Sequence, residues 1–237
     1  MSELLDHNDW TLLSASFTSA MLDAPGPAEA DQVLNEMGWA DLLHAAPGPA
    51  VAIAFSALGA SGSAATLLDD VVAHALGIPI SPSSCVFFPT SLHTNPAAPQ
   101  PGDPRSLMEE DPLVLNGLVS SRIDRANTVV LPVDEFEGTE TATIEAGLLQ
   151  TPALTGIDPD HPYRHVSAHI ATDDLTPLQT KGNWEAAMTA ARMALAYQLL
   201  GGARWMLDEA RQHAIDREQF GRPVASFRRF ATNWPSR

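Results

Sequence analysis

The segment with the clearest potential for chemistry lies near the C-terminal end of the chain, where residues 210–227 read ARQHAIDREQFGRPVASF. Within it, Arg217 carries a guanidinium, which offers paired N–H donors in a fixed plane and so suits a phosphate or a carboxylate. Residues 204–237 hold seven basic residues against four acidic ones, although the chain as a whole has a net charge of −16. We therefore expect an anionic ligand or an acidic partner to meet this end of the molecule.

The same segment closely resembles the signature that opens the C-terminal helical domain of the acyl-CoA dehydrogenase family. In that signature a helix is followed by R-x-x-F-G-x-P, a hydrophobic residue and a second Phe, which here extends from Arg217 to Phe227. The resemblance implies FAD as cofactor, an acyl-CoA as substrate and a role in lipid metabolism. It also implies that Arg217, Gln219 and Phe220 contact the flavin dinucleotide of a neighbouring subunit. Gly221 would permit the tight turn that follows.

A purely structural interpretation of the same residues remains open at this point. Arg217 could form a surface ion pair with Asp216 or Glu218, and Phe220 could belong to the core. A short motif alone is a hypothesis about function.

The catalytic base of the family has no counterpart in this sequence. Family members remove a proton from the thioester with a Glu, which one branch carries on the helix upstream of the signature. By position this residue is Ala191 here, and alanine cannot accept a proton. Glu185 lies on the same helix but almost two turns too early. We therefore assign no catalytic residue, and the resemblance implies that a partner subunit supplies the Glu.

Other departures concern the flavin pocket. The glutamine that normally follows the second Phe is Arg228 here, and the nearest candidate for the family's substrate-and-flavin turn is the segment 88–91, Phe-Pro-Thr-Ser. The sequence stops at Arg237, before most of the helical bundle of the family. Because the bundle would be incomplete, we expect apolar faces to be exposed. Such patches usually mark a partner. A truncated longer protein is a further interpretation.

Other polar groupings point to no site. His161, His165 and His169 recur every four residues, but no Cys or carboxylate completes a metal site, so we expect structural or exposed histidines. Asp69 and Asp70 are expected on a solvated helix face.

The composition excludes some classes of function. The acid excess, 29 Asp and Glu against 13 Lys and Arg, opposes a generic nucleic-acid binder and an anionic membrane surface as partner. Cys85 is the single cysteine, so no intrachain disulfide can form, and we expect it to be a small buried residue. No signal peptide or membrane span is evident, which leads us to expect a cytoplasmic protein.

Helical patterns dominate both ends of the chain. Near the N-terminus the sequence predicts helices over about 8–22, 27–38 and 55–76, separated by Pro and Gly. Near the C-terminus it predicts one long helix over about 183–219, capped by Asn183 and with its apolar face formed by several large residues (Met188, Leu195, Leu199, Met206 and Ala210). The mid-helix pair of glycines at 201–202 predicts close helix packing.

Short strand patterns occupy the middle of the chain. We predict strands over 113–119, 128–133, 141–146 and 164–171, with an Asn-Gly turn at 116–117 inside the first. They indicate a small β domain, a partial barrel or a sandwich.

The expected fold is α+β and acyl-CoA dehydrogenase-like. We predict an N-terminal helical region over 1–78, a middle β domain over 79–178 and the start of a C-terminal helical bundle over 179–237. By resemblance the chain is a FAD-dependent acyl-CoA dehydrogenase that forms homo- or hetero-oligomers. The alternative is a non-catalytic companion subunit, or a degenerate relative, that contributes to a flavin site across an interface.

Overall fold

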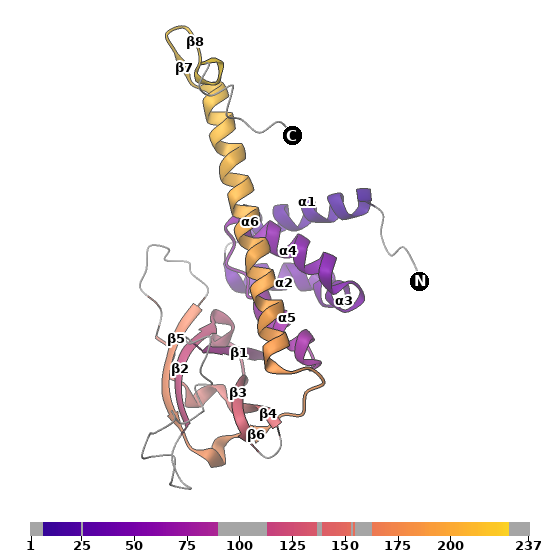
Figure 1. Cartoon of the computed structure of the whole chain (residues 1–237), viewed down its shortest axis with the longest axis vertical. Coiled ribbons are helices and arrows are strands. Elements are labelled where there is room, and N and C mark those ends of the chain that lie inside the picture. The colour runs from indigo at the N-terminus through magenta and orange to yellow at the C-terminus, as the bar shows by residue number, and fades with distance from the viewer. Residues whose placement is uncertain are drawn as a thin grey trace.

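The computed structural model places a helical body beside a β-sheet, with one long helix running past both (Figure 1). It describes residues 7–24, 26–89, 113–136, 139–152, 154 and 163–227. Five residues named above lie outside the described part: Thr90, Ser91, His161, Arg228 and Arg237. In the described part, no helix is long and apolar enough to cross a membrane.

Five helices form the N-terminal body. They are α1 (His7–Asp23), α2 (Pro27–Glu36), α3 (Trp39–Ala45), α4 (Pro47–Ser61) and α5 (Leu67–Leu76). Proline begins α2 and α4, where its fixed φ suits the first helical turn. Gly77, with a φ of 71°, ends α5 in the left-handed conformation that glycine adopts without strain.

The predicted helix over 55–76 is wrong, because two helices share this stretch. Gly62 has a φ of 67° and ends α4, and α5 begins only at Leu67. Helix α4 also begins earlier than predicted, at Pro47, so the prolines at 47 and 49 lie in its first turn, where a missing N–H costs no hydrogen bond.

The strands form a six-stranded mixed sheet in the order β5-β2-β1-β3-β4-β6. Their bounds are β1 (Ser84–Pro89), β2 (Leu113–Ser120), β3 (Thr128–Phe136), β4 (Thr139–Glu145), β5 (Tyr163–Ile170) and β6 (Thr176–Pro177). Only β1 and β3 are parallel, and the other pairs are antiparallel. Three short 3-10 turns in this region are η2 (Ser121–Asp124), η3 (Ala146–Leu148) and η4 (Thr172–Asp174).

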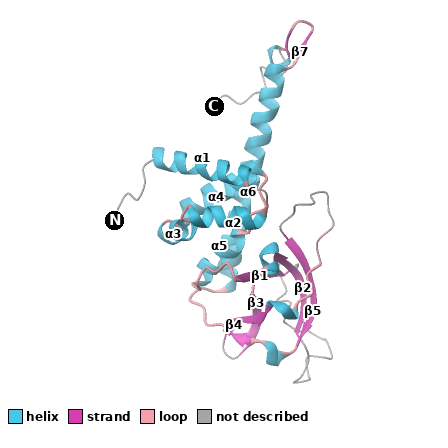
Figure 2. Cartoon of the chain, turned by 180° about the vertical axis from the view of Figure 1, so that it is seen from behind, coloured by secondary structure: helices cyan, strands magenta, loops and turns pink. Residues whose placement is uncertain are grey.

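The central strands are buried on both faces and so join two cores. Along β1, Val86 belongs to the core of the helical body, whereas Cys85 and Phe87 belong to a second core on the other face of the sheet. Strand β3 repeats the arrangement with Val130 and Leu131. This alternation follows from the two-residue period of a strand. Figure 2 shows the sheet beside α5.

The predicted Asn-Gly turn is wrong, because residues 116–117 lie inside the continuous strand β2. Gly117 pairs with Pro89 on one side and with Val166 on the other. A Cβ at this position would collide with the carbonyl oxygen of Phe88 and the ring of Phe87. Glycine is therefore needed here because β1 lies close to β2 at this position, and not because the chain turns.

Helix α6 (Trp184–Asp216) packs against α4 and α5 through small residues. Asn183 caps it as predicted, accepting a hydrogen bond from the N–H of Ala186 at 2.8 Å. The predicted close packing at the glycine pair is confirmed, because a Cβ on Gly201 would collide with the carbonyl oxygen of Ser56 in α4.

The predicted apolar face of α6 is the wrong one. Its buried positions hold Ala187, Ala191, Ala194, Gly201 and Ala214, whereas the large residues of the prediction are mostly exposed. Small residues occupy the contact because they let the backbone of α6 lie close to the neighbouring helices.

Candidate functional site

The residues singled out by the signature share one hairpin at the far end of α6 (Figure 1). After the helix ends at Asp216, strand β7 (Glu218–Gln219) pairs with strand β8 (Arg222–Pro223). The two residues between them, Phe220 and Gly221, have φ values of 55° and 74°. Positive φ at both central positions is what a tight two-residue hairpin turn requires, and it explains the glycine. The 3-10 turn η5 (Val224–Ser226) follows.

Hydrogen bonds along the backbone hold Arg217 at the base of this hairpin. Its N–H donates to the carbonyl of His213 at 2.9 Å, and its own carbonyl accepts from the N–H of Val224 at 2.8 Å. The guanidinium of Arg222 stacks on the ring of Phe227, 4.3 Å from the centroid, which ties the second strand to the residues beyond η5.

The side chains at the hairpin face outward. Arg217 and Gln219 are exposed, and Phe220 is 95% exposed. Among the described residues, Arg217 has no ion-pair partner, and Phe220 is not in either core. The surface-pair interpretation of Arg217 and the core interpretation of Phe220 are therefore wrong.

Exposed apolar residues continue along the half of α6 that leads to the hairpin. Beyond the contact of Gly201 and Gly202 with α4, the helix stands clear of the helical body in both views (Figures 1 and 2). Large side chains that are exposed over its surface are Leu199, Leu200, Trp205, Met206, Leu207 and Ile215. We call this set the α6 apolar surface. It confirms the expectation of exposed apolar faces.

No carboxylate takes the place of the family's base on α6. Ala191 is 4% exposed and belongs to the core between α6 and the N-terminal helices. Glu185 lies in the first turn of α6 with an exposed side chain. On this helix, the structure brings no acid to the position from which the resemblance implies proton removal.

Other predicted residues fall at scattered places. Cys85 is fully buried in the sheet, where burial raises the pKa of its thiol. His165 on β5 has its Nε2 3.2 Å from Oδ1 of Asn116 on β2, and His169 is exposed. Phe88, at the end of β1, packs edge-on against the ring of Tyr163.

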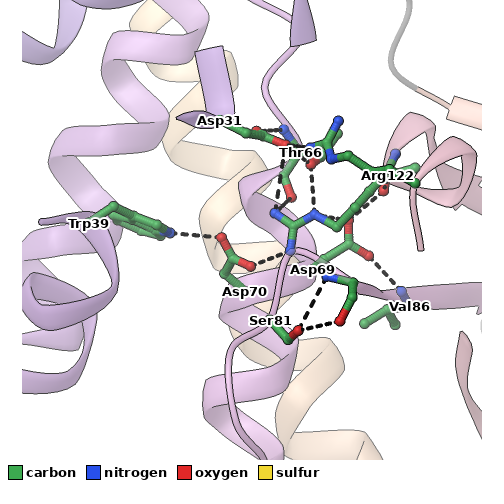
Figure 3. Close-up of polar contacts among 11 residues, drawn as sticks. Asp31, Trp39, Thr66, Asp69, Asp70, Ser81, Val86 and Arg122 are labelled. Atoms are coloured by element: carbon green, nitrogen blue, oxygen red, sulfur yellow. Dashed lines mark hydrogen bonds and ion pairs between the residues drawn. The ribbon is translucent and has the colours of Figure 1, made fainter. Parts of the chain in front are cut away.

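A group of buried charges lies where the helical body meets the sheet. It comprises Asp31 on α2, Asp69 and Asp70 on α5, Arg122 on η2 and Arg125 just after η2, and we call it the junction cluster. All three carboxylates and Arg122 are less than 5% exposed. Figure 3 shows the carboxylates converging on Arg122. The expectation that Asp69 and Asp70 are solvated is wrong.

Each guanidinium of the cluster has its own carboxylate. Arg122 donates to Asp70 through Nη1, and Arg125 donates to Asp31 through Nη2. Arg122 further donates to Oγ1 of Thr66 through Nε and to its carbonyl through Nη2, both at 2.9 Å. Burial alone would lower the pKa of Arg122, but the carboxylates, Asp69 first, raise it above its ordinary value.

Sequence reasoning missed this cluster, although a signal was present. Asp69 and Asp70 stand in the run ATLLDDVVAHAL, whose neighbours leave no polar face for a solvated pair. Arg122 likewise follows the apolar strand β2. Adjacent acids within an apolar run, together with a distant lone arginine, are what a buried ion pair requires.

Both the C-terminal segment and the overall fold are similar to those of known proteins. Residues 183–233 match the family described as "Acyl-CoA dehydrogenase, C-terminal domain". No curated protein sequence matches the chain.

Solved structures with the same arrangement cover most of the chain. A chain of the ChsE4-ChsE5 complex from Mycobacterium tuberculosis has a TM-score of 0.64 at 18% identity, over 98% of this chain and 73% of that one. An acyl-CoA dehydrogenase from Geobacillus kaustophilus has a TM-score of 0.57 at 13% identity, over 98% of this chain and 75% of that one. A glutaryl-CoA dehydrogenase from Mycobacterium smegmatis, in complex with FADH2, has a TM-score of 0.56 at 13% identity, over 97% of this chain and 71% of that one.

The C-terminal segment thus matches the family in sequence, and nearly the whole chain shares its fold. The chain therefore has an acyl-CoA dehydrogenase-like fold, and its residues 183–233 match the C-terminal domain of that family.

Proposed function

We propose that the chain is one subunit of a FAD-dependent acyl-CoA dehydrogenase whose flavin site is completed across a subunit interface. In this proposal Arg217, Gln219 and Phe220 hold part of the FAD, and a partner subunit supplies the catalytic Glu. The observation that carries it is the placement of the hairpin, which stands at the far end of α6, clear of the helical body, with Phe220 95% exposed.

The hairpin has the chemistry that one end of FAD requires. An exposed guanidinium without an ion-pair partner among the described residues can give paired donors to a pyrophosphate. An exposed aromatic ring beside it offers a flat apolar surface. When bound, FAD would accept a hydride from the β-carbon of the acyl thioester. This chain's own residues would bind and orient the dinucleotide.

The α6 apolar surface favours a protein partner. Its large side chains, such as Leu199 at 76% exposed and Trp205 at 51%, extend from the middle of the helix toward the hairpin. Contiguous exposed apolar residues mark interaction sites, because their burial is favourable. We infer that a helical face of another acyl-CoA dehydrogenase-like subunit covers them and brings FAD to the hairpin.

The absence of a carboxylate at Ala191 bears on which subunit removes the proton. Because Ala191 is buried against the N-terminal helices, its position cannot face a substrate, so proton removal has to come from elsewhere. The same observation favours a second candidate function, a non-catalytic companion that contributes to a flavin site but takes no part in a reaction.

Coexpression separates these candidates. The full chain would be purified alone and together with acyl-CoA dehydrogenase-like proteins encoded by neighbouring genes, and FAD content and acyl-CoA-dependent dye reduction would be measured. Bound FAD with dehydrogenation supports the enzyme, and FAD bound by the complex without turnover supports the companion. A chain that never takes part in a flavin-containing assembly contradicts both.

A further inference from the structure

The junction cluster contains one more carboxylate than it has guanidiniums. Arg122 pairs with Asp70 and Arg125 pairs with Asp31, which leaves Asp69 with no hydrogen bond from a guanidinium among the described residues. The Nε of Arg122 is 3.9 Å from Oδ2 of Asp69, too far for a hydrogen bond. With all three acids ionised, the five side chains carry one net negative charge in a buried position.

Asp69 connects the helical body to the sheet through hydrogen bonds with uncharged groups. Its Oδ1 accepts from the N–H of Val86 on β1 at 2.6 Å, and its Oδ2 is 2.5 Å from the hydroxyl of Ser120 at the end of β2. A protonated carboxyl could keep both contacts, because a hydroxyl can accept as well as donate.

We propose that Asp69 is a proton-binding site that couples the packing of the N-terminal helices against the sheet to pH. With the proton bound, the junction cluster is neutral. When the proton leaves, the cluster holds one net negative charge, buried between the two elements that Asp69 connects, and the folded state is weakened.

The groups that face Asp69 agree with this assignment. Burial raises its pKa to about 6, against the lowering effect of Arg122 and of the hydrogen bonds from Ser120 and Val86. Asp70 on α5 adds to the rise. The titratable side chains that face it from the sheet are Cys85 on β1 and Tyr163 on β5, and burial, reinforced by Asp69, raises the pKa of both.

A small cavity adjoins this carboxyl. Asp69, Asp70 and Arg122 line it together with Ser81, Ser84 and Cys85, and it has room for about one water molecule.

The direction of the pH effect follows from the two pKa values of Asp69. Its folded pKa of about 6 lies above the ordinary value of 3.8, so the folded state holds the proton more tightly. The stabilisation is complete below pH 3.8 and is lost as the pH rises through about 6. Over that window Asp69 alone should raise the unfolding equilibrium constant about a hundredfold.

The test compares unfolding of the full chain by urea across this pH window, for the wild type and for Asp69→Asn. The amide keeps the acceptor for Val86 and can donate to Ser120, but it cannot ionise. We expect the unfolding constant of the wild type, relative to the variant, to grow about a hundredfold between pH 3.8 and 6 and then to level off. Asp41→Asn, an exposed site on α3, is the control and should leave the wild-type profile unchanged. Parallel profiles for the wild type and Asp69→Asn would overturn the proposal.

A second measurement decides the question if Asp69→Asn does not fold. Carbon-13 NMR of the aspartate carboxyls in the folded wild type should show one signal that titrates near pH 6. Ser120→Ala removes a donor to the carboxylate and should move that midpoint upward. Carboxyl signals that all titrate at ordinary aspartate values would overturn the proposal.

Discussion

Asp70 joins Arg122 to Trp39 across the junction of the helical body and the sheet. One of its oxygens accepts from the guanidinium of Arg122, and the other accepts from the indole nitrogen of Trp39 at 3.0 Å. Trp39 is fully buried on α3, and Arg122 lies on the turn that follows β2. A single carboxylate on α5 thereby fixes one element of the helical body and one of the sheet.

Replacing Arg122 should weaken the fold strongly. Arg122→Leu keeps much of the volume but leaves three buried carboxylates with only Arg125 nearby, and removing one partner of a buried ion pair costs about 3–5 kcal/mol. Urea unfolding at neutral pH measures the change. The control is Arg192→Leu, at an exposed position of α6, which should stay within about 0.5 kcal/mol of wild type. Similar losses for both variants would refute the structural role of Arg122.

Gly201 should not tolerate a methyl group. A Cβ there would meet the backbone of Ser56, which cannot rotate away, so Gly201→Ala should cost about 1–3 kcal/mol by overpacking. Gly48→Ala provides a matched comparison, since Gly48 lies in α4 with no atom within 4 Å of the added Cβ. That change should be neutral or stabilising by up to about 1 kcal/mol. Thermal unfolding that shifted both variants in the same direction would contradict the close contact between α4 and α6.

Restoring the family's acid on α6 should fail. Ala191→Glu would place a carboxylate in the apolar core, where an uncompensated charge costs about 3 kcal/mol or more, so the variant should lose stability and gain no dehydrogenase activity. Ala196→Glu, at an exposed position of the same helix, should remain within about 0.5 kcal/mol of wild type. Acyl-CoA turnover by Ala191→Glu without a partner would show that this position faces the substrate.

The local signals in the sequence predicted much of the fold. Proline at 27, glycine at 77 and Asn183 mark helix boundaries because each has a conformational or capping preference that acts within a few residues. The alternating and β-branched run at 128–133 likewise predicted β3.

The errors arose where a distant contact decides the outcome. Gly117 looks like a turn residue until the ring of Phe87 is placed against it. The buried face of α6 is the one with small residues because the backbone of α4 lies close to it. Asp69 and Asp70 look solvated because Arg122, more than fifty positions away, supplies their counter-charge. The hairpin residues were identified through the resemblance, and the structure added their exposure.

The central claim, that this chain contributes to a flavin site across an interface, rests on Arg217. The most direct test is the affinity of the coexpressed complex for FAD, measured by titration calorimetry. It compares the wild type, Arg217→Ala and the control Arg211→Ala, at an exposed position of α6. Loss of a charge-assisted contact to a phosphate should weaken FAD binding about 10- to 100-fold in Arg217→Ala, with Arg211→Ala unchanged. Equal FAD affinity in wild type and Arg217→Ala would contradict the account.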